Sequence, residues 1–324
     1  MKKLLILFCA LLSLISLARA EELSFALEGD HVTGAIRVNG YTFAIDATLT
    51  DNRPEAGHIA YASRAIDRAV WEAALAARFP QQAETLTARM IQWAGDVVTT
   101  TDYPVSPFPA VLPASENYPD PWLTARLDAC AAFLSDVGVA YDPHPFSAAY
   151  VMPRPGRASF LYLDPSDRDK AIGANICFLL THEQTPLTVW LQLGRYNGSI
   201  DHTGAAAASL HPTAQFFFDM DGSLLDFQIA ILDTHTSGAL PADFLPWEDA
   251  LTLMLREYAS NDIIQRNLQA FSYTVTDIRC AWDMDFHHQG RPGWMISLCA
   301  KSADDDSPTG WINRYTTAFV YGAD

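Results

Sequence analysis

The chain has 324 residues, of which 49% are hydrophobic and 18% charged, a balance typical of a folded protein rather than a disordered one. Its formal net charge of −17 disfavours binding to phosphate backbones and to anionic lipid surfaces, because like charges repel. Nucleic acid is therefore not expected as a partner.

The first twenty residues predict an export signal. Lys2 and Lys3 precede an almost unbroken apolar run over 4–17, and Ala18-Arg19-Ala20 places small residues at the cleavage position. The run is too short for a bilayer span, which takes about 20 residues, and no later run of that length lacks charge. We expect cleavage after Ala20, no transmembrane segment, and a secreted or extracytoplasmic protein of 304 residues with net charge −20. No cysteine stands at the cleavage point, so a lipid anchor is not expected.

Residues 21–115 predict an N-terminal α+β unit. Alternating runs at 23–27, 32–38 and 41–49 are separated by turn pairs, which is typical of a meander of hairpin strands. Apolar residues then recur at helical spacing from Ile66 to Phe79, and a second helix is expected from about 82 to 93. Prolines are dense between 104 and 121 and mark the boundary, because neither helix interiors nor central strands tolerate them.

Residues 116–324 predict a C-terminal α+β region with two helix-then-meander segments. Asp120 as the N-cap and Pro121 at the first helical position begin a helix that Gly138 ends. A second helix follows Pro246. Strands are expected near 148–151, 159–163, 172–180, 187–193, 214–218, 224–231, 271–286, 294–300 and 312–321. The whole chain therefore predicts an α+β fold, with helices packed on antiparallel β-sheets in two units after a signal peptide.

Four cysteines remain after the signal: Cys130, Cys177, Cys280 and Cys299. Export permits disulfides, and the spacings match no zinc-binding pattern. Residue alternation places Cys280 and Cys299 on opposite faces of an expected hairpin, which disfavours a bridge between them. A bulge, or a sheet buried on both faces, would relax that argument, so the pairing is left open.

Asp219-Met220-Asp221-Gly222 follows an apolar strand and resembles the first motif of haloacid-dehalogenase-like phosphatases. That resemblance implies Asp219 as nucleophile and Asp221 as general acid and base, with a magnesium ion beside them. The family is built on a parallel sheet, whereas the residues after Asp219 predict antiparallel strands. A hairpin with Asp219–Gly222 as its turn is therefore favoured, and a metal-dependent phosphatase-like hydrolase is kept as the alternative.

Asp283, Asp285 and His287 alternate along one expected strand and so share a face, where they could hold a divalent metal. Residues two apart in a strand are about 6.6–7 Å apart at Cα, so one strand rarely closes a coordination shell. A solvated polar face is therefore favoured, and no metal or cofactor is expected. The eight tryptophans could stack on a carbohydrate, although aromatic side chains more often fill a core.

Three segments together resemble a family of exported bacterial proteins, frequently lipoproteins, that is defined only as a domain of unknown function. They are Tyr41–Ala47, Leu245–Ala250, and the strand pair Tyr273–Met284 with Gly293–Ile296. The resemblance implies a helix across an antiparallel sheet and no catalytic residue. We therefore expect a non-enzymatic binding or interaction module of the cell envelope, whose partner is a protein or another envelope component.

Overall fold

The computed structural model describes residues 22–93, 97–100, 120–145, 147–153, 160–163, 165–188, 213–260, 271–284, 289–302 and 315–323. Strands make up 51% and helices 25% of it, and the strands form two sheets. The expected α+β class, with helices packed on antiparallel sheets, is therefore wrong, and the fold is β-rich. The reason lies in how the two sheets are assembled and how they cover each other.

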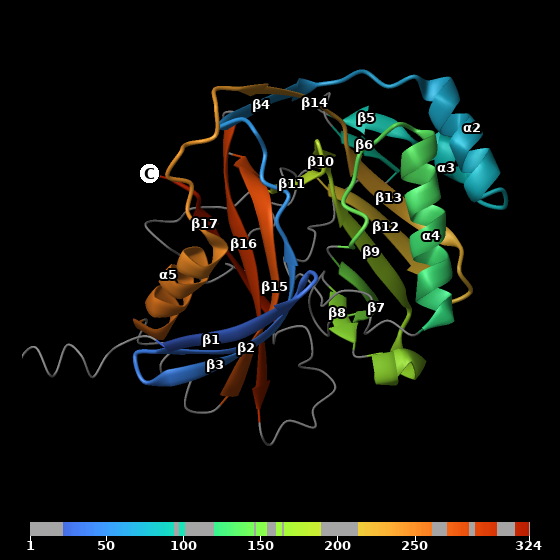
Figure 1. Ribbon diagram of the computed structural model, residues 1–324. Coiled ribbons are helices and arrows are strands. Elements are labelled where there is room, and N and C mark those ends of the chain that lie inside the picture. Colours follow the sequence, from blue (N-terminus) through green and yellow to red (C-terminus); the bar gives the residue numbers. More distant parts are fainter. Residues whose placement is uncertain are drawn as a thin grey trace, which may run out of the picture.

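The larger sheet has ten strands and gathers both ends of the chain (Figure 1). Its main order is β1 (Glu22–Glu28), β2 (His31–Val38), β3 (Tyr41–Thr50), β15 (Phe271–Met284), β16 (Gln289–Ser302), β4 (His58–Ser63) and β14 (Leu232–Ser237). β17 (Tyr315–Tyr321) also pairs with β16, and β11 (Thr185–Thr188) joins β10 (Thr181–His182) to β15. β15 pairs in parallel with both β3 and β11, so this sheet is mixed.

The smaller sheet has seven strands, and all of its pairs are antiparallel. Its order is β5 (Ile91–Trp93), β6 (Val97–Thr99), β13 (Leu224–Ala230), β12 (Thr213–Asp219), β9 (Gly173–Leu179), β7 (Ser147–Pro153) and β8 (Phe160–Leu163). A short 3-10 helix, η2 (Pro165–Lys170), precedes β9. Residues 21–115 thus contribute strands to both sheets.

Helices lie on the outer side of each sheet (Figure 1). α2 (Arg68–Arg78), α3 (Ala83–Arg89) and α4 (Pro121–Asp136) cover the smaller sheet, and α5 (Trp247–Ser260) packs on the larger one. α4 begins as its sequence predicts, because the Asp120 carboxylate accepts a hydrogen bond from the Trp122 N–H at 2.8 Å. It ends before Gly138, whose φ of +68° is the left-handed conformation expected there.

The inner faces of the two sheets pack on each other. A small apolar cluster of Cys177 and Leu179 from β9 with Ala281 from β15 and Met295 from β16 joins them. The long strands β15 and β16 are therefore covered on both sides, by α5 on one face and by the smaller sheet on the other. Much of the apolar surface is therefore buried between the two sheets, whereas the sequence patterns predict that helices cover it.

None of the four cysteines in the described part of the chain forms a disulfide. Cys280 faces the cluster under α5, whereas Cys299 packs on the other side, as residue alternation predicts. Burial raises the pKa of Cys177 and of Cys280 to about 12 and that of Cys130 well above its usual value. The reactive thiolate is therefore scarce at neutral pH.

We expect Cys130, Cys177 and Cys280 of the native mature protein to react only slowly with iodoacetamide, and the mature chain to take up four labels once it is unfolded without reductant. Intact-mass spectrometry of the two samples checks this. Two labels in the unfolded sample would show one disulfide and contradict the assignment of four free thiols.

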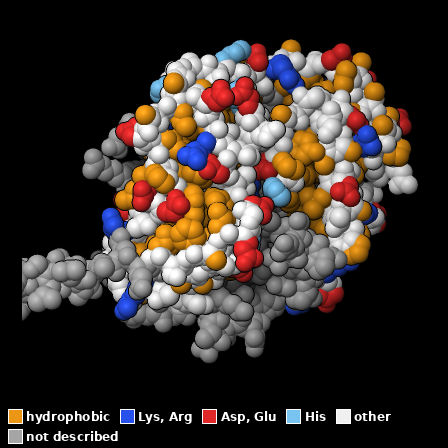
Figure 2. All heavy atoms as spheres, viewed as in Figure 1, with side chains coloured by type: hydrophobic (Ala, Val, Ile, Leu, Met, Phe, Trp, Pro, Cys, Tyr) orange, Lys and Arg blue, Asp and Glu red, His pale blue; other side chains and the backbone are white. Residues whose placement is uncertain are grey.

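Among the described residues, no helix is long and apolar enough to cross a membrane. Figure 2 shows acidic side chains scattered over the visible face among few basic ones, in keeping with the 38 acidic and 21 basic residues of the chain.

Candidate functional site

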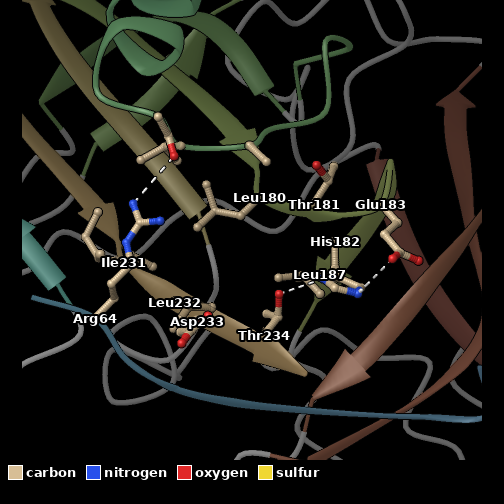
Figure 3. Close-up of a pocket in the computed structure, with 14 residues that line it drawn as sticks. Arg64, Leu180, Thr181, His182, Glu183, Leu187, Ile231, Leu232, Asp233 and Thr234 are labelled. Atoms are coloured by element: carbon tan, nitrogen blue, oxygen red, sulfur yellow. Dashed lines mark hydrogen bonds and ion pairs between the residues drawn. The ribbon is translucent and has the colours of Figure 1, made fainter. Parts of the chain in front are cut away.

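A pocket of about 240 Å³ lies where the chain passes from the smaller sheet to the larger one. β13 ends at Ala230 and β14 begins at Leu232, while β9 ends at Leu179 and β10 begins at Thr181. Buried Leu180, Leu187 and Ile231 contribute apolar side chains to a lining whose surface is mostly polar. The segment after α4 and Arg64, which follows β4, complete the lining (Figure 3).

Polar groups lie on both sides of these apolar side chains. At one end, Arg64 extends toward the backbone carbonyl of Gly138, with its Nη2 3.5 Å from that oxygen (Figure 3). At the other end, His182 Nδ1 lies 2.6 Å from Thr234 Oγ1 and links β10 to β14. His182 Nε2 faces Glu183 at 3.9 Å and has no hydrogen-bond partner among the residues that the structure describes.

The β10–β11 hairpin holds His182 in place with a strained turn. Register pairs Thr181 with Pro186 and His182 with Thr185, leaving Glu183 and Gln184 as a two-residue loop. Their φ angles are +48° and +72°, in the left-handed region. Two-residue loops of this kind favour Asn and Gly. Each non-glycine residue held in this conformation costs about 1–3 kcal/mol. Strain of this kind is concentrated at binding and catalytic sites.

The charges around the pocket are mixed. Arg64 is exposed and forms no ion pair within the described part of the chain. Glu183 and Asp233 line the pocket but are mostly exposed, at 72% and 59% of their side-chain area, and Asp233 lies 3.6 Å from His235. The pocket therefore offers several hydrogen-bonding groups around a small apolar area rather than a strong field of one sign.

A buried ionic group lies between the sheets. Arg279 of β15 forms two hydrogen bonds to the Asp277 carboxylate, at 2.6 and 2.7 Å, and one to Asp142 at 2.6 Å. Burial disfavours the charged guanidinium, but the two carboxylates outweigh it and hold the pKa of Arg279 above its usual value. This group is fully paired and therefore has a structural role.

Asp219 and Asp221 lie where the sequence predicts, at the turn of the β12–β13 hairpin. The Ser223 N–H donates to an oxygen of each carboxylate at 2.9 Å, and Gly222 has a φ of +93°. Partial burial and the hydrogen bond to Asp221 raise the pKa of Asp219, while that same bond and Ser223 lower the pKa of Asp221. Both neighbours of β12 are antiparallel, unlike the parallel sheet that the phosphatase resemblance implies.

Of the second candidate site, Asp283, Asp285 and His287, only Asp283 lies among the described residues. Asp283 is 7% exposed and accepts a hydrogen bond from the Tyr321 hydroxyl at 2.6 Å, so it is not on a solvated face. Asp285 and His287 lie outside the described residues. Among the described residues, no three His, Cys, Asp or Glu side chains are grouped to hold a metal ion.

Sequence reasoning did not find the pocket. Its lining comes from separate segments around Arg64, Gly138, His182, Leu187 and Thr234, and no local motif connects them. Only the structure shows that Glu183-Gln184 forms a strained turn, because neither residue is a typical turn former.

Comparison with known proteins assigns no function to this β-rich fold. No protein-family model and no curated protein matches the chain. Its structure is similar to the crystal structure of an uncharacterized protein from Eubacterium rectale, at 10% sequence identity and a TM-score of 0.43. That similarity covers 86% of this chain and 87% of the other, and it is too low to carry an argument about function. The resemblance to exported bacterial proteins of unknown function remains a hypothesis.

Proposed function

We propose that this protein is a secreted, non-enzymatic binding module of the cell envelope and that it binds a small ligand in the pocket beside His182. The observation that carries the proposal is the pocket itself, in which hydrogen-bonding groups converge around three buried apolar side chains. The strained turn supports it, because the fold maintains a costly conformation at the rim. The export signal predicted at residues 1–20 supports a role outside the cytoplasm.

The alternative, a metal-dependent phosphatase-like hydrolase, has less support from geometry. Asp219 and Asp221 both accept the Ser223 N–H, as expected of carboxylates that stabilise a turn. The guanidinium of Arg126 lies against Gly222 and further closes this end of the hairpin. Binding in the pocket is therefore the function that the described residues favour.

A pocket-filling substitution tests the proposal. Thr181→Trp places an indole at the pocket, and Thr33→Trp places one on an exposed position of β2 as a matched control. We expect at least one probe from a panel of amino acids, short carboxylates and neutral sugars to raise the Tm of the wild type and of Thr33→Trp, but not that of Thr181→Trp. An equal shift in all three proteins, or a shift in none, would contradict binding in the pocket.

A further inference from the structure

Arg64 is the cationic group of the pocket. Among the described residues that line the pocket it is the only arginine or lysine, and it extends from the end of β4 toward the segment after α4 (Figure 3). Its backbone is held in place, because its carbonyl accepts a hydrogen bond from the Gln92 side chain at 2.8 Å. Its guanidinium contacts the Gly138 carbonyl at 3.5 Å, which is long for an N–H···O hydrogen bond. Within the described chain, most of its five N–H donors are therefore available to a ligand.

Arg64 also has no carboxylate partner among the described residues. Carboxylates are plentiful in this chain, which has 38 acidic and 21 basic residues. Six other arginines of the described part each form an ion pair with an aspartate or a glutamate: Arg53, Arg68, Arg78, Arg89, Arg168 and Arg279. An arginine that lines a pocket without such a partner can pair with the carboxylate of a ligand.

The two acidic residues of the lining do not neutralise Arg64. Glu183 lies 3.9 Å from His182 and Asp233 lies 3.6 Å from His235, and neither forms an ion pair with Arg64. Each acidic residue thus has a histidine neighbour that balances its charge when protonated. Arg64 is therefore the charged group of the lining that a ligand of opposite charge can pair with most directly.

We propose that the pocket binds a small aliphatic carboxylate, whose carboxylate group pairs with Arg64. The inference rests on the proposed function, since it names the ligand class of the same pocket. A planar guanidinium presents two parallel N–H groups to a carboxylate and can bind it in a bidentate manner. The aliphatic part of the ligand lies against the buried apolar side chains of Leu180, Leu187 and Ile231.

The lining limits both the charge and the size of the ligand. One guanidinium balances one negative charge, and Glu183 and Asp233 would repel a second. This favours a monocarboxylate over a phosphate or a dicarboxylate. A volume of about 240 Å³ is below the usual range for drug-sized ligands. Because the apolar area is small as well, the pocket suits an acid of a few carbons rather than a long fatty acid.

Three probes with the same carbon skeleton separate charge from shape. Isovalerate is anionic at neutral pH, isovaleramide is neutral and isoamylamine is cationic. Thermal unfolding of the mature chain at increasing probe concentrations gives an apparent Kd for each probe. We expect isovalerate to raise the Tm of the wild type and to bind about tenfold more tightly than isovaleramide. Isoamylamine should leave the Tm unchanged.

Variants of Arg64 test its role in this binding. Arg64→Gln removes the charge, Arg64→Lys keeps it, and Arg37→Gln changes an exposed arginine of β2 that does not line the pocket. Arg64 is itself exposed, so its variants should fold as the wild type does. We expect Arg64→Gln to bind isovalerate about tenfold more weakly and isovaleramide as the wild type does. Arg64→Lys should recover part of the isovalerate binding, and Arg37→Gln should retain all of it.

The outcomes separate this inference from the proposed function. Isovalerate binding that is unchanged in Arg64→Gln, equal binding of isovalerate and isovaleramide to the wild type, or no isovalerate binding at all would overturn the carboxylate site. The pocket proposal survives that result if another probe raises the Tm of the wild type and Thr181→Trp abolishes the shift. Isovalerate binding that persists in Thr181→Trp would place the carboxylate outside the pocket and overturn both.

Discussion

Replacing Arg279 with methionine is expected to lower the free energy of unfolding by about 3–5 kcal/mol, because it leaves two carboxylates buried without a counter-charge. The Arg279 side chain is 3% exposed, and those of Asp277 and Asp142 are 3% and 6% exposed. Asp277 shares the strand with Arg279, whereas Asp142 lies between α4 and β7, so the group also joins distant parts of the chain. Urea unfolding followed by fluorescence measures the loss.

The matched control is Arg53→Met. Arg53 also forms a bidentate pair, with Asp51 at 2.7 and 2.8 Å, but its side chain is 47% exposed. An exposed pair contributes about 0–1 kcal/mol, so this variant should unfold almost as the wild type does. Adding Asp142→Asn and Asp277→Asn to Arg279→Met should recover part of the stability. A loss of under about 1 kcal/mol for Arg279→Met would contradict the role of the buried group.

Replacing Phe133 with alanine is expected to cost about 3–5 kcal/mol through the cavity it leaves. Phe133 of α4 is fully buried, and four aromatic rings surround it. The ring centroids of Trp71, Phe227, Phe79 and Phe216 lie 5.7, 5.8, 5.9 and 6.1 Å from that of Phe133. These neighbours come from α2, its C-terminal end, and strands β12 and β13, so the substitution loosens both helices from the sheet.

Phe25→Ala is the matched control, because it also replaces a phenylalanine with alanine but at an exposed position. Phe25 is 40% exposed on β1, at the edge of the larger sheet, and contacts Trp247 at a centroid distance of 5.1 Å. Its removal should lower the free energy of unfolding by roughly 1 kcal/mol, which is less than half of the loss expected at Phe133. Equal losses at the two positions, measured by the same urea unfolding, would show that Phe133 is not the centre of this core.

Local sequence patterns predict most of the helices and strands but not which strands pair with each other. The three N-terminal strands, α4 with its Asp120 cap, and α5 after Pro246 are all present near the expected bounds. Residues 91–93 form β5 instead of continuing a helix, because a three-residue strand has no pattern of its own. The pairing of β3 with β15 joins residues more than two hundred positions apart, and alternation along either strand carries no information about it.

The same limit applies to the sites. The Asp219–Gly222 turn depends on neighbouring residues, so its hairpin is readable from the sequence. The pocket depends on which strands lie side by side. Gln215 and Gln228 occupy apolar runs that predict strands, but nothing in those runs shows that the two amides are neighbours on a buried face.

The most direct test of a binding role is a crystal structure of the mature chain soaked with the probe that gives the largest thermal shift. The proposal predicts ligand density in the pocket beside Thr181 and His182. A pocket that contains only solvent at a saturating concentration of that probe would contradict it.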